Sequence, residues 1–162
     1  MQYYDIIIET IKGGNLKYKY DPPTGIFKLR KALPLGMIFP YDFGFIEGTK
    51  GEDGDPLDAM IISEFSSFTG CKMKCRLVGV LLAEQTEGRK KIRNDRYFFI
   101  PDESVIFSSI NSMTQLGTKH NEQLKEFFVN YNKAEGKLFT PLRMITAEKG
   151  ATMLAKAYNP GG

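Results

Sequence analysis

The 162-residue sequence contains a single histidine, His120, and only two cysteines, Cys71 and Cys75. This scarcity excludes the common structural zinc sites, because the cysteine spacing is wrong and no second pair completes a ligand set. It also leaves His120 as the only imidazole for Ser-His-Asp or Cys-His catalysis, and nothing near it completes such an arrangement. We therefore expect His120 on the surface. Both thiols, which are four residues apart on one face of a strand, are expected in the core.

The sequence also lacks any apolar run of about 18 residues, the length that a membrane-spanning helix needs. Its first five residues include no basic stretch, and the apolar residues 6–8 end at Glu9, so no signal peptide is expected. A cytoplasmic location follows by default. Ordinary proportions of apolar (42%) and charged (25%) residues predict one domain, residues 1–162, with a sizeable core.

The sequence also lacks a large excess of either sign of charge, since the net charge is only +3. Its main concentration is residues 89–93, Arg-Lys-Lys-Ile-Arg, which follow Gly88 and are predicted to form a hairpin tip. Such a run is more often a solvated loop than a nucleic-acid contact. Aromatic residues do not alternate with it, so the stacking pattern of single-strand binders is missing.

Short β-rich runs dominate the first hundred residues, separated by turns rich in Gly, Pro and Asn. The expected strands cover residues 5–10, 16–20, 25–30, 57–62, 72–84 and 92–100. From Leu124 to Tyr131, apolar residues then recur at the i, i+3, i+4, i+7 spacing of an amphipathic helix. A weaker stripe over residues 147–158 indicates a second helix. Strands followed by helices predict an α+β domain without internal repeats.

Residues 53–58, Asp-Gly-Asp-Pro-Leu-Asp, place three carboxylates so close together that they repel one another unless a cation lies among them. Pro56 fixes its own φ and pushes Asp55 into extended geometry, so this acidic loop is stiff. Oxygen-only ligands favour a hard cation such as Mg2+, Mn2+ or Ca2+. An EF-hand is excluded, because Leu57 and Asp58 stand at its fifth and sixth positions. On this segment alone, a solvated acidic turn is an equal alternative.

Upstream, residues 37–46 read Met-Ile-Phe-Pro-Tyr-Asp-Phe-Gly-Phe-Ile, and with the acidic loop they resemble the family I soluble inorganic pyrophosphatases. That family carries aromatic-Pro-x-Asn/Asp-aromatic-Gly-aromatic-Ile, followed by Asp-Gly-Asp-Pro-hydrophobic-Asp. The resemblance extends from Ile6 to Tyr131 and includes residues 16–18, 27–30, 75–81 and 127–131. It implies a small closed five-stranded, OB-like β-barrel flanked by helices. It also implies a homo-oligomer, because bacterial relatives form hexamers.

The resemblance implies hydrolysis of pyrophosphate, or of another small phosphoanhydride, with Mg2+ as cofactor and Mn2+ as a substitute. Two divalent ions can neutralise the phosphate oxygens and activate a water, whose proton a carboxylate accepts. By resemblance, Asp53 and Asp58 are metal ligands, and Asp55 faces the metals and is the general base. Glu9 matches a carboxylate that helps to hold further metals.

Lys17, Arg30 and Tyr131 match family positions that bind the phosphates, and Arg30 suits this because its planar fork matches phosphate oxygens. Each also has a plain structural alternative. Arg30 could be a strand-edge charge, Lys17 a solvated lysine, and Tyr131 a core residue of its helix whose hydroxyl still reaches the site. Phe39 and Phe43 are most simply core residues.

Several positions of the implied site depart from the family pattern. Lys19 replaces a Glu, Phe43 a Tyr, Gln85 and Asn94 two metal-binding Asp residues, Arg96 a phosphate-binding Lys, and Asn132 another Lys. The changes at Lys19, Gln85 and Asn94 alone make the pocket about four charge units more positive. Asn94 can still offer a neutral carbonyl to a metal, but ions resting on it and Gln85 are expected to be weak or absent.

Glu84 and Asp95 adjoin the two lost carboxylates in the sequence. Glu84 and Asp95 could replace the lost carboxylates only if a bulge shifted the strand, because a plain one-residue slip turns each side chain to the opposite face.

Three functional hypotheses remain. In the first, the protein is a divergent Mg2+-dependent pyrophosphatase in which Lys19 or Arg96 takes a metal's place. In the second, it has lost hydrolysis and binds phosphate, a nucleotide or a protein partner. In the third, which the composition favours least, it binds nucleic acid. Retention of the whole acidic loop favours the first, with reduced turnover because groups that act together have been lost.

Overall fold

The computed structural model describes residues 2–158, so Met1 and residues 159–162 of the expected single domain lie outside it. The elements are β1 (Tyr4–Thr10), β2 (Leu16–Asp21), β3 (Ile26–Ala32), β4 (Asp42–Ile46), β5 (Asp58–Ile61), β6 (Lys72–Glu87), β7 (Lys90–Arg93), β8 (Arg96–Pro101), the 3-10 helix η1 (Met113–Leu116), α1 (Thr118–Ala134), β9 (Leu138–Ile145) and α2 (Ala147–Ala157). Within residues 2–158, neither α-helix is long and apolar enough to cross a membrane.

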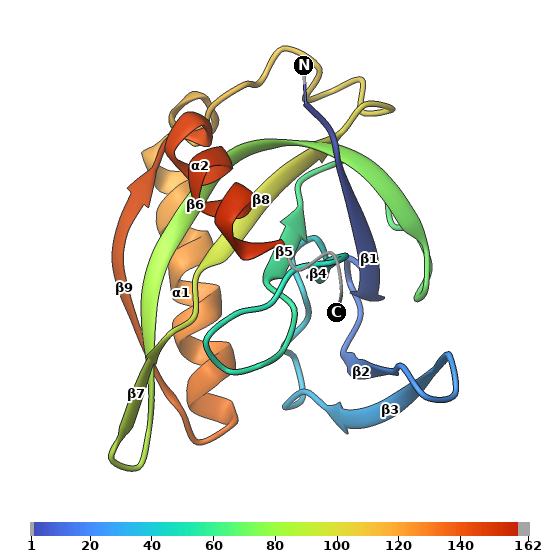
Figure 1. The fold of residues 1–162 in the computed structure, drawn as a ribbon, viewed down its shortest axis with the longest axis vertical. Coiled ribbons are helices and arrows are strands. Elements are labelled where there is room, and N and C mark those ends of the chain that lie inside the picture. The colour runs from blue at the N-terminus through green and yellow to red at the C-terminus, as the bar shows by residue number, and fades with distance from the viewer. Residues whose placement is uncertain (1, 159–162) are drawn as a thin grey trace.

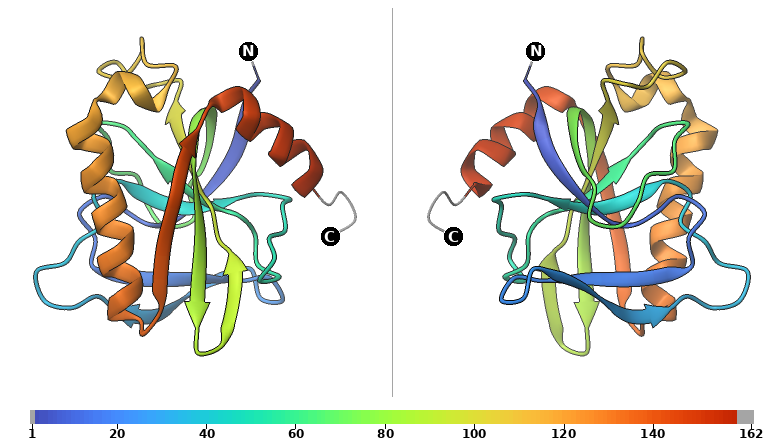
Figure 2. Two further views of the ribbon diagram at one scale, coloured as in Figure 1. Left: turned by 90° about the vertical axis from the view of Figure 1, so that its left-hand side faces the viewer. Right: turned by 90° about the vertical axis from the view of Figure 1, so that its right-hand side faces the viewer.

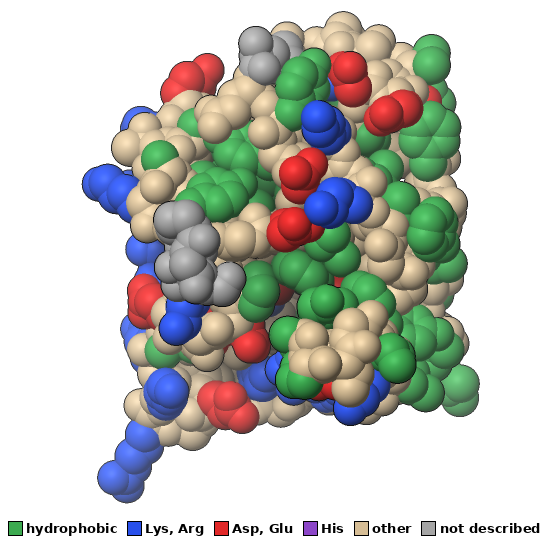
Figure 3. Space-filling model, turned by 45° about the vertical axis from the view of Figure 1, so that its right-hand side comes forward, with side chains coloured by type: hydrophobic (Ala, Val, Ile, Leu, Met, Phe, Trp, Pro, Cys, Tyr) green, Lys and Arg blue, Asp and Glu red, His purple; other side chains and the backbone are tan. Residues whose placement is uncertain are grey.

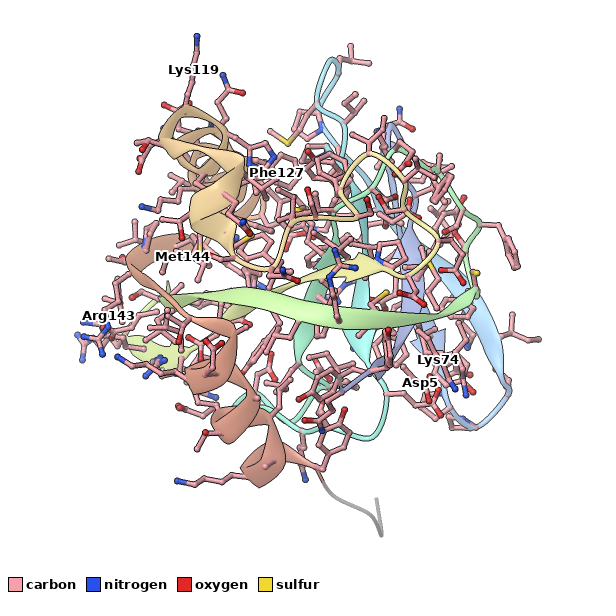
Figure 4. All side chains as sticks on the ribbon, turned by 90° about the horizontal axis from the view of Figure 1, so that it is seen from above. Asp5, Lys74, Lys119, Phe127, Arg143 and Met144 are labelled. Atoms are coloured by element: carbon pink, nitrogen blue, oxygen red, sulfur yellow. The ribbon has the colours of Figure 1, made fainter. Side chains whose placement is uncertain are left out.

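Five strands pair into a closed ring, in the order β1-β4-β5-β8-β6 and back to β1. All these pairings are antiparallel except the parallel one between β5 and β8. The ring closes where β1 meets β6, and there Asp5 lies opposite Lys74 (Figure 4). The 16-residue strand β6 continues beyond the ring to pair with β7 and β9 (Figure 1). The expected α+β class and five-stranded closure are confirmed.

The core follows from alternation along the strands and from the apolar stripe of α1. In β1 every second residue is buried, as a strand with one face towards a core requires. Helix α1 packs along β9 on one side of the ring and α2 packs against β6 on another (Figure 2). On α1, Phe127 points towards the core and Lys119 into solvent (Figure 4), as the predicted helical period requires.

Strands β2 and β3 form a separate two-stranded hairpin that lies across one end of the ring (Figure 2). The close contact of β1 with β4 inside the ring depends on Gly44, because a Cβ there would lie 1.8 Å from the carbonyl oxygen of Ile7. This explains why the segment Phe-Gly-Phe carries glycine between two aromatic residues. The hairpin and the ring enclose the space in which the site lies.

Several expected elements were wrong in extent. The single strand expected over residues 92–100 is two strands, β7 and β8, because the Asn94 N–H turns to the Ala83 carbonyl (3.0 Å) and interrupts the run. Strand β6 extends three residues beyond its expected end. Strand β9 was missed because Pro141 lies within it, which is tolerated at a sheet edge where the register shifts. Strand β4 was also not predicted.

Three sequence expectations concern single side chains. Cys75 is in the core as expected, whereas Cys71 is only half-buried and precedes β6. His120, expected on the surface, is half-buried, and its Nε2 lies 2.9 Å from the Tyr41 hydroxyl. Of the basic residues after Gly88, only Arg89 lies in the expected hairpin tip, and the others form β7 itself.

The core assignment predicts a large difference between two phenylalanines. Phe98 is fully buried between the ring and α1, whereas Phe68 is 65% exposed. Phe98→Ala should lower the free energy of unfolding by about 3–5 kcal/mol, because it leaves a cavity in a packed core. Phe68→Ala should change it by less than about 0.5 kcal/mol. Denaturant unfolding measures both, and equal losses would contradict this core.

Candidate active site

The nine candidate site residues line one cavity of about 580 Å³ between the ring and the β2–β3 hairpin. They are Glu9 (β1), Lys17 (β2), Arg30 (β3), Asp53 and Asp55 (the acidic loop), Asp58 (β5), Asn94, Arg96 (β8) and Tyr131 (α1). The other departures from the family pattern, Lys19, Phe43, Gln85 and Asn132, line it as well. Basic and acidic side chains lie together where the surface is hollowed beside the β2–β3 turn (Figure 3).

The acidic loop forms the rim of this cavity. Asp53 and Asp55 are exposed, and Asp53 Oδ1 accepts a hydrogen bond from the Asp55 N–H at 2.9 Å. A second bond, from the Gly51 N–H to the Asp55 carbonyl at 2.8 Å, closes the loop. Lys19 Nζ lies 3.9 Å from Asp55 Oδ1, and both side chains are more than half exposed. Water therefore screens this pair, and Asp55 remains available to other partners.

Deeper in the cavity, Arg96 forms an ion pair with Asp58. Arg96 Nη1 donates to Asp58 Oδ2 at 2.7 Å, and the two side chains are 3% and 26% exposed. The guanidinium lies over the rings of Phe128 and Phe139, 5.2 and 5.0 Å from their centroids. The Arg96 side chain is thus held by an ion pair and by two aromatic faces, and one oxygen of Asp58 is engaged by it.

The two lost carboxylates are replaced by amides that bind each other. Asn94 Nδ2 donates to Gln85 Oε1 at 2.7 Å. Neither Glu84 nor Asp95 takes over, because neither lines the cavity. Asp95 instead accepts from Arg93 and from the Ala83 N–H. The shifted register considered for this strand is therefore wrong.

One charged residue of the cavity was missed in the sequence. Glu135, just after α1, is surrounded by three lysines: Lys17 at 3.0 Å, Lys31 at 3.5 Å and Lys137 at 3.8 Å. Its side chain is only 4% exposed. Burial acts to raise the pKa of Glu135, but the charge and hydrogen bond of Lys17 outweigh it and lower the pKa below its usual value. The only sequence signal was its place one helical turn after Tyr131.

The groups contributed by α1 are largely donors. The Tyr131 hydroxyl is buried beside the Glu135 carboxylate and makes no well-formed hydrogen bond among the described residues. Burial, followed by the nearby Glu135 carboxylate, raises the pKa of Tyr131, so the hydroxyl keeps its proton. Asn132 donates from Nδ2 to the Phe128 carbonyl at 2.8 Å, so this amide group is occupied by its own helix.

Whether the cavity fits divalent cations can be judged from its donors. Among residues 2–158, no three Asp, Glu, His or Cys side chains are grouped closely enough to hold a metal ion by themselves. Asp53, Asp55 and the second oxygen of Asp58 are nevertheless donors of the kind that Mg2+ prefers, and Mg2+ commonly keeps water and substrate phosphate among its ligands. Further ions do not fit, because Gln85 and Asn94 present neutral amides to each other.

Glu9 makes the stability of the folded protein depend on pH. Burial, and then the neighbouring Asp58, raises the pKa of Glu9 to about 7. At pH values between the pKa of Glu9 in the unfolded chain and pH 7, this carboxyl is protonated in the folded state but ionised in the unfolded state. Stability from this group is therefore present at low pH and lost as pH rises through 7.

We therefore expect Glu9→Gln to be more stable than the natural chain at pH 8.5, by as much as about 3 kcal/mol, and close to it at pH 5. Denaturant unfolding at both values measures the difference. Glu103→Gln, at an exposed position outside the cavity, is the control and should change little. A Glu9→Gln effect of equal size at both pH values would contradict the raised pKa of Glu9.

Comparison with known proteins gives a consistent result. A family model described as inorganic pyrophosphatase matches residues 6–159. The inorganic pyrophosphatase of Halalkalibacterium halodurans is 32% identical over 154 residues, which cover 95% of this chain and 92% of that protein. The one of Sulfolobus acidocaldarius is 30% identical over 133 residues, covering 81% and 75%. The solved structure of the Helicobacter pylori inorganic pyrophosphatase superposes with a TM-score of 0.88 at 27% identity, covering 96% and 91%. The chain therefore belongs to the inorganic pyrophosphatase family.

Proposed function

We propose that this chain hydrolyses inorganic pyrophosphate to phosphate in the cavity, with Mg2+ as its cofactor and with reduced turnover. One observation carries the proposal. The three carboxylates of the acidic loop share a single cavity with the phosphate-binding candidates Lys17 and Arg30. Family membership supports the same reaction.

The chemistry requires charge neutralisation and a positioned water more than covalent help. Bound Mg2+ would neutralise phosphate charge and make its water more acidic. Asp55 is exposed at the rim with only a screened contact to Lys19, and it would accept the proton of the attacking water. Asp53 and the free oxygen of Asp58 are the carboxylate oxygens that would hold the metal beside it.

The opposite side of the cavity would bind the phosphates. Arg30 is exposed on β3 and forms no ion pair within the described chain, so its planar fork is free to match phosphate oxygens. Lys17 lies 5.0 Å from the centroid of the Tyr131 ring, where Glu135 holds it. Tyr131 contributes a protonated hydroxyl as a further donor.

Reduced turnover follows from the groups that this cavity lacks. Phe43 presents no hydroxyl, Asn132 binds its own helix, and Gln85 with Asn94 presents no charge to a metal. Catalytic groups in one site act together, so the groups that remain do not fully compensate for those that are lost. These same features favour the second candidate function, binding of phosphate or a nucleotide without hydrolysis.

We further propose that the whole chain is one domain and forms a cytoplasmic homo-oligomer, with the hexamer as the expected form. Apolar side chains left in solvent support an assembly. Val105 and Ile106 are 77% and 68% exposed, and Leu35 is fully exposed. Sedimentation equilibrium of the purified chain would test the assembly, and a monomer would contradict it.

The reaction is tested by phosphate release from pyrophosphate with Mg2+, and then with Mn2+. Asp55→Asn should lower kcat by at least about 100-fold, the usual contribution of a general base. Glu52→Gln is a matched control, because Glu52 immediately precedes the acidic loop and does not line the cavity. It should remain within about twofold of the natural chain, as for surface substitutions. No release from folded natural chain would establish the non-hydrolysing alternative.

A further inference from the structure

The cavity is richer in fixed positive charge than its acidic loop suggests. Its basic side chains are Lys17, Lys19, Arg30, Lys50, Arg96 and Lys137, and its acidic ones are Glu9, Asp53, Asp55, Asp58 and Glu135. Two of these acids are already neutralised inside the protein, Asp58 by Arg96 and Glu135 by Lys17. This leaves four basic side chains, Lys19, Arg30, Lys50 and Lys137, against the three carboxylates of Glu9, Asp53 and Asp55.

Two buried donors of cavity residues also make no well-formed hydrogen bond, although the Tyr131 hydroxyl lies beside the Glu135 carboxylate. Within residues 2–158, three buried side-chain polar atoms have no hydrogen-bond partner, and two of them, Arg96 Nε and the Tyr131 hydroxyl, belong to residues that line the cavity. A buried donor without a partner costs about 1–3 kcal/mol, so native proteins rarely leave one unless it serves a purpose. Arg96 Nε can only donate, so a group that completes it carries an acceptor oxygen.

Arg96 is suited to act as a permanent cation here. A guanidinium does not lose its proton in proteins, and unlike a metal ion it does not dissociate. Its ion pair with Asp58 and its place over two aromatic rings hold it at one position. Beside Asp58, where a divalent ion would otherwise neutralise charge, the chain supplies that charge itself.

We infer that the cavity binds the oxygens of a phosphoanhydride through its own cations and donors, Arg96 and Tyr131 among them, so that binding requires no divalent cation. The inference rests on the proposed function for the class of ligand, but not for its turnover. Mg2+ then serves the hydrolytic step at the acidic loop and is not needed to hold the substrate.

The test is calorimetric titration with methylenediphosphonate, a diphosphate analogue whose P–C–P link resists hydrolysis, in excess EDTA and then in Mg2+. We expect saturable one-site binding in EDTA, with a Kd within about fivefold of the Mg2+ value, or about 1 kcal/mol. Arg96→Gln should weaken binding in EDTA by at least about tenfold, because a charge-assisted contact is lost. Arg93→Gln is the matched control, since Arg93 pairs with Asp95 and lies outside the cavity.

Arg96→Gln could unfold the chain, so Tyr131→Phe provides a second variant. It removes only the unpartnered hydroxyl and keeps the ring against Phe39 and Phe127. It should weaken binding of the analogue while changing the stability of the free protein little, because the hydroxyl makes no well-formed hydrogen bond there. A purely structural hydroxyl would leave binding unchanged.

The outcomes separate the inference from the proposed function. Binding that appears only with Mg2+, or an Arg93→Gln loss equal to that of Arg96→Gln, would overturn the inference. Phosphate release from pyrophosphate is measured on the same preparations. Metal-free binding without release in Mg2+ would leave the inference standing and overturn the proposed function, whereas release without metal-free binding would do the reverse.

Discussion

The ion pair between Asp58 and Arg96 is the interaction on which the site depends. The two residues stand opposite each other at the beginning of β5 and β8, the only parallel pairing in the ring. Their 2.7 Å contact fixes the two strand starts and also sets the charge at the base of the cavity. Removing one partner of a buried pair leaves an uncompensated charge, which is far costlier than the pair is worth. The same ion pair therefore contributes to the fold and to the charge of the site.

The surrounding charges follow from that arrangement. Arg96 occupies one oxygen of Asp58, and Gln85 and Asn94 bind each other, so metal ligation is left to the acidic loop at the rim. On the opposite wall, Glu135 gathers three lysines around one buried carboxylate. The cavity thus combines a carboxylate rim suited to activating water with an interior suited to phosphate oxygens. This division of labour explains how the chain can lose metal-binding carboxylates and still present a phosphate site.

Much of this could be predicted from the sequence, because the signals are local. The acidic loop and the period of α1 each follow from short-range chemistry, whereas the need for glycine at position 44 comes from the close approach of Ile7 on another strand. Strand β9 could not, since Pro141 argues against a strand and only the edge position beside β6 makes it tolerable. Glu135 was missed because a carboxylate near a helix end normally faces solvent, whereas here Lys17 and Lys31 reach it from the β2–β3 hairpin.

The sequence by itself determined the family, the α+β class and the candidate residues of the site, because motif order and side-chain type are written along the chain. Only the tertiary structure decided which of those residues are free and which are occupied. Arg96 meets Asp58 across two strands, and Asn94 meets Gln85 across a hairpin, at separations in the sequence that carry no local signal. Which side chains pair depends on their distance and burial in the folded protein, and this pairing determines the charge that the site presents.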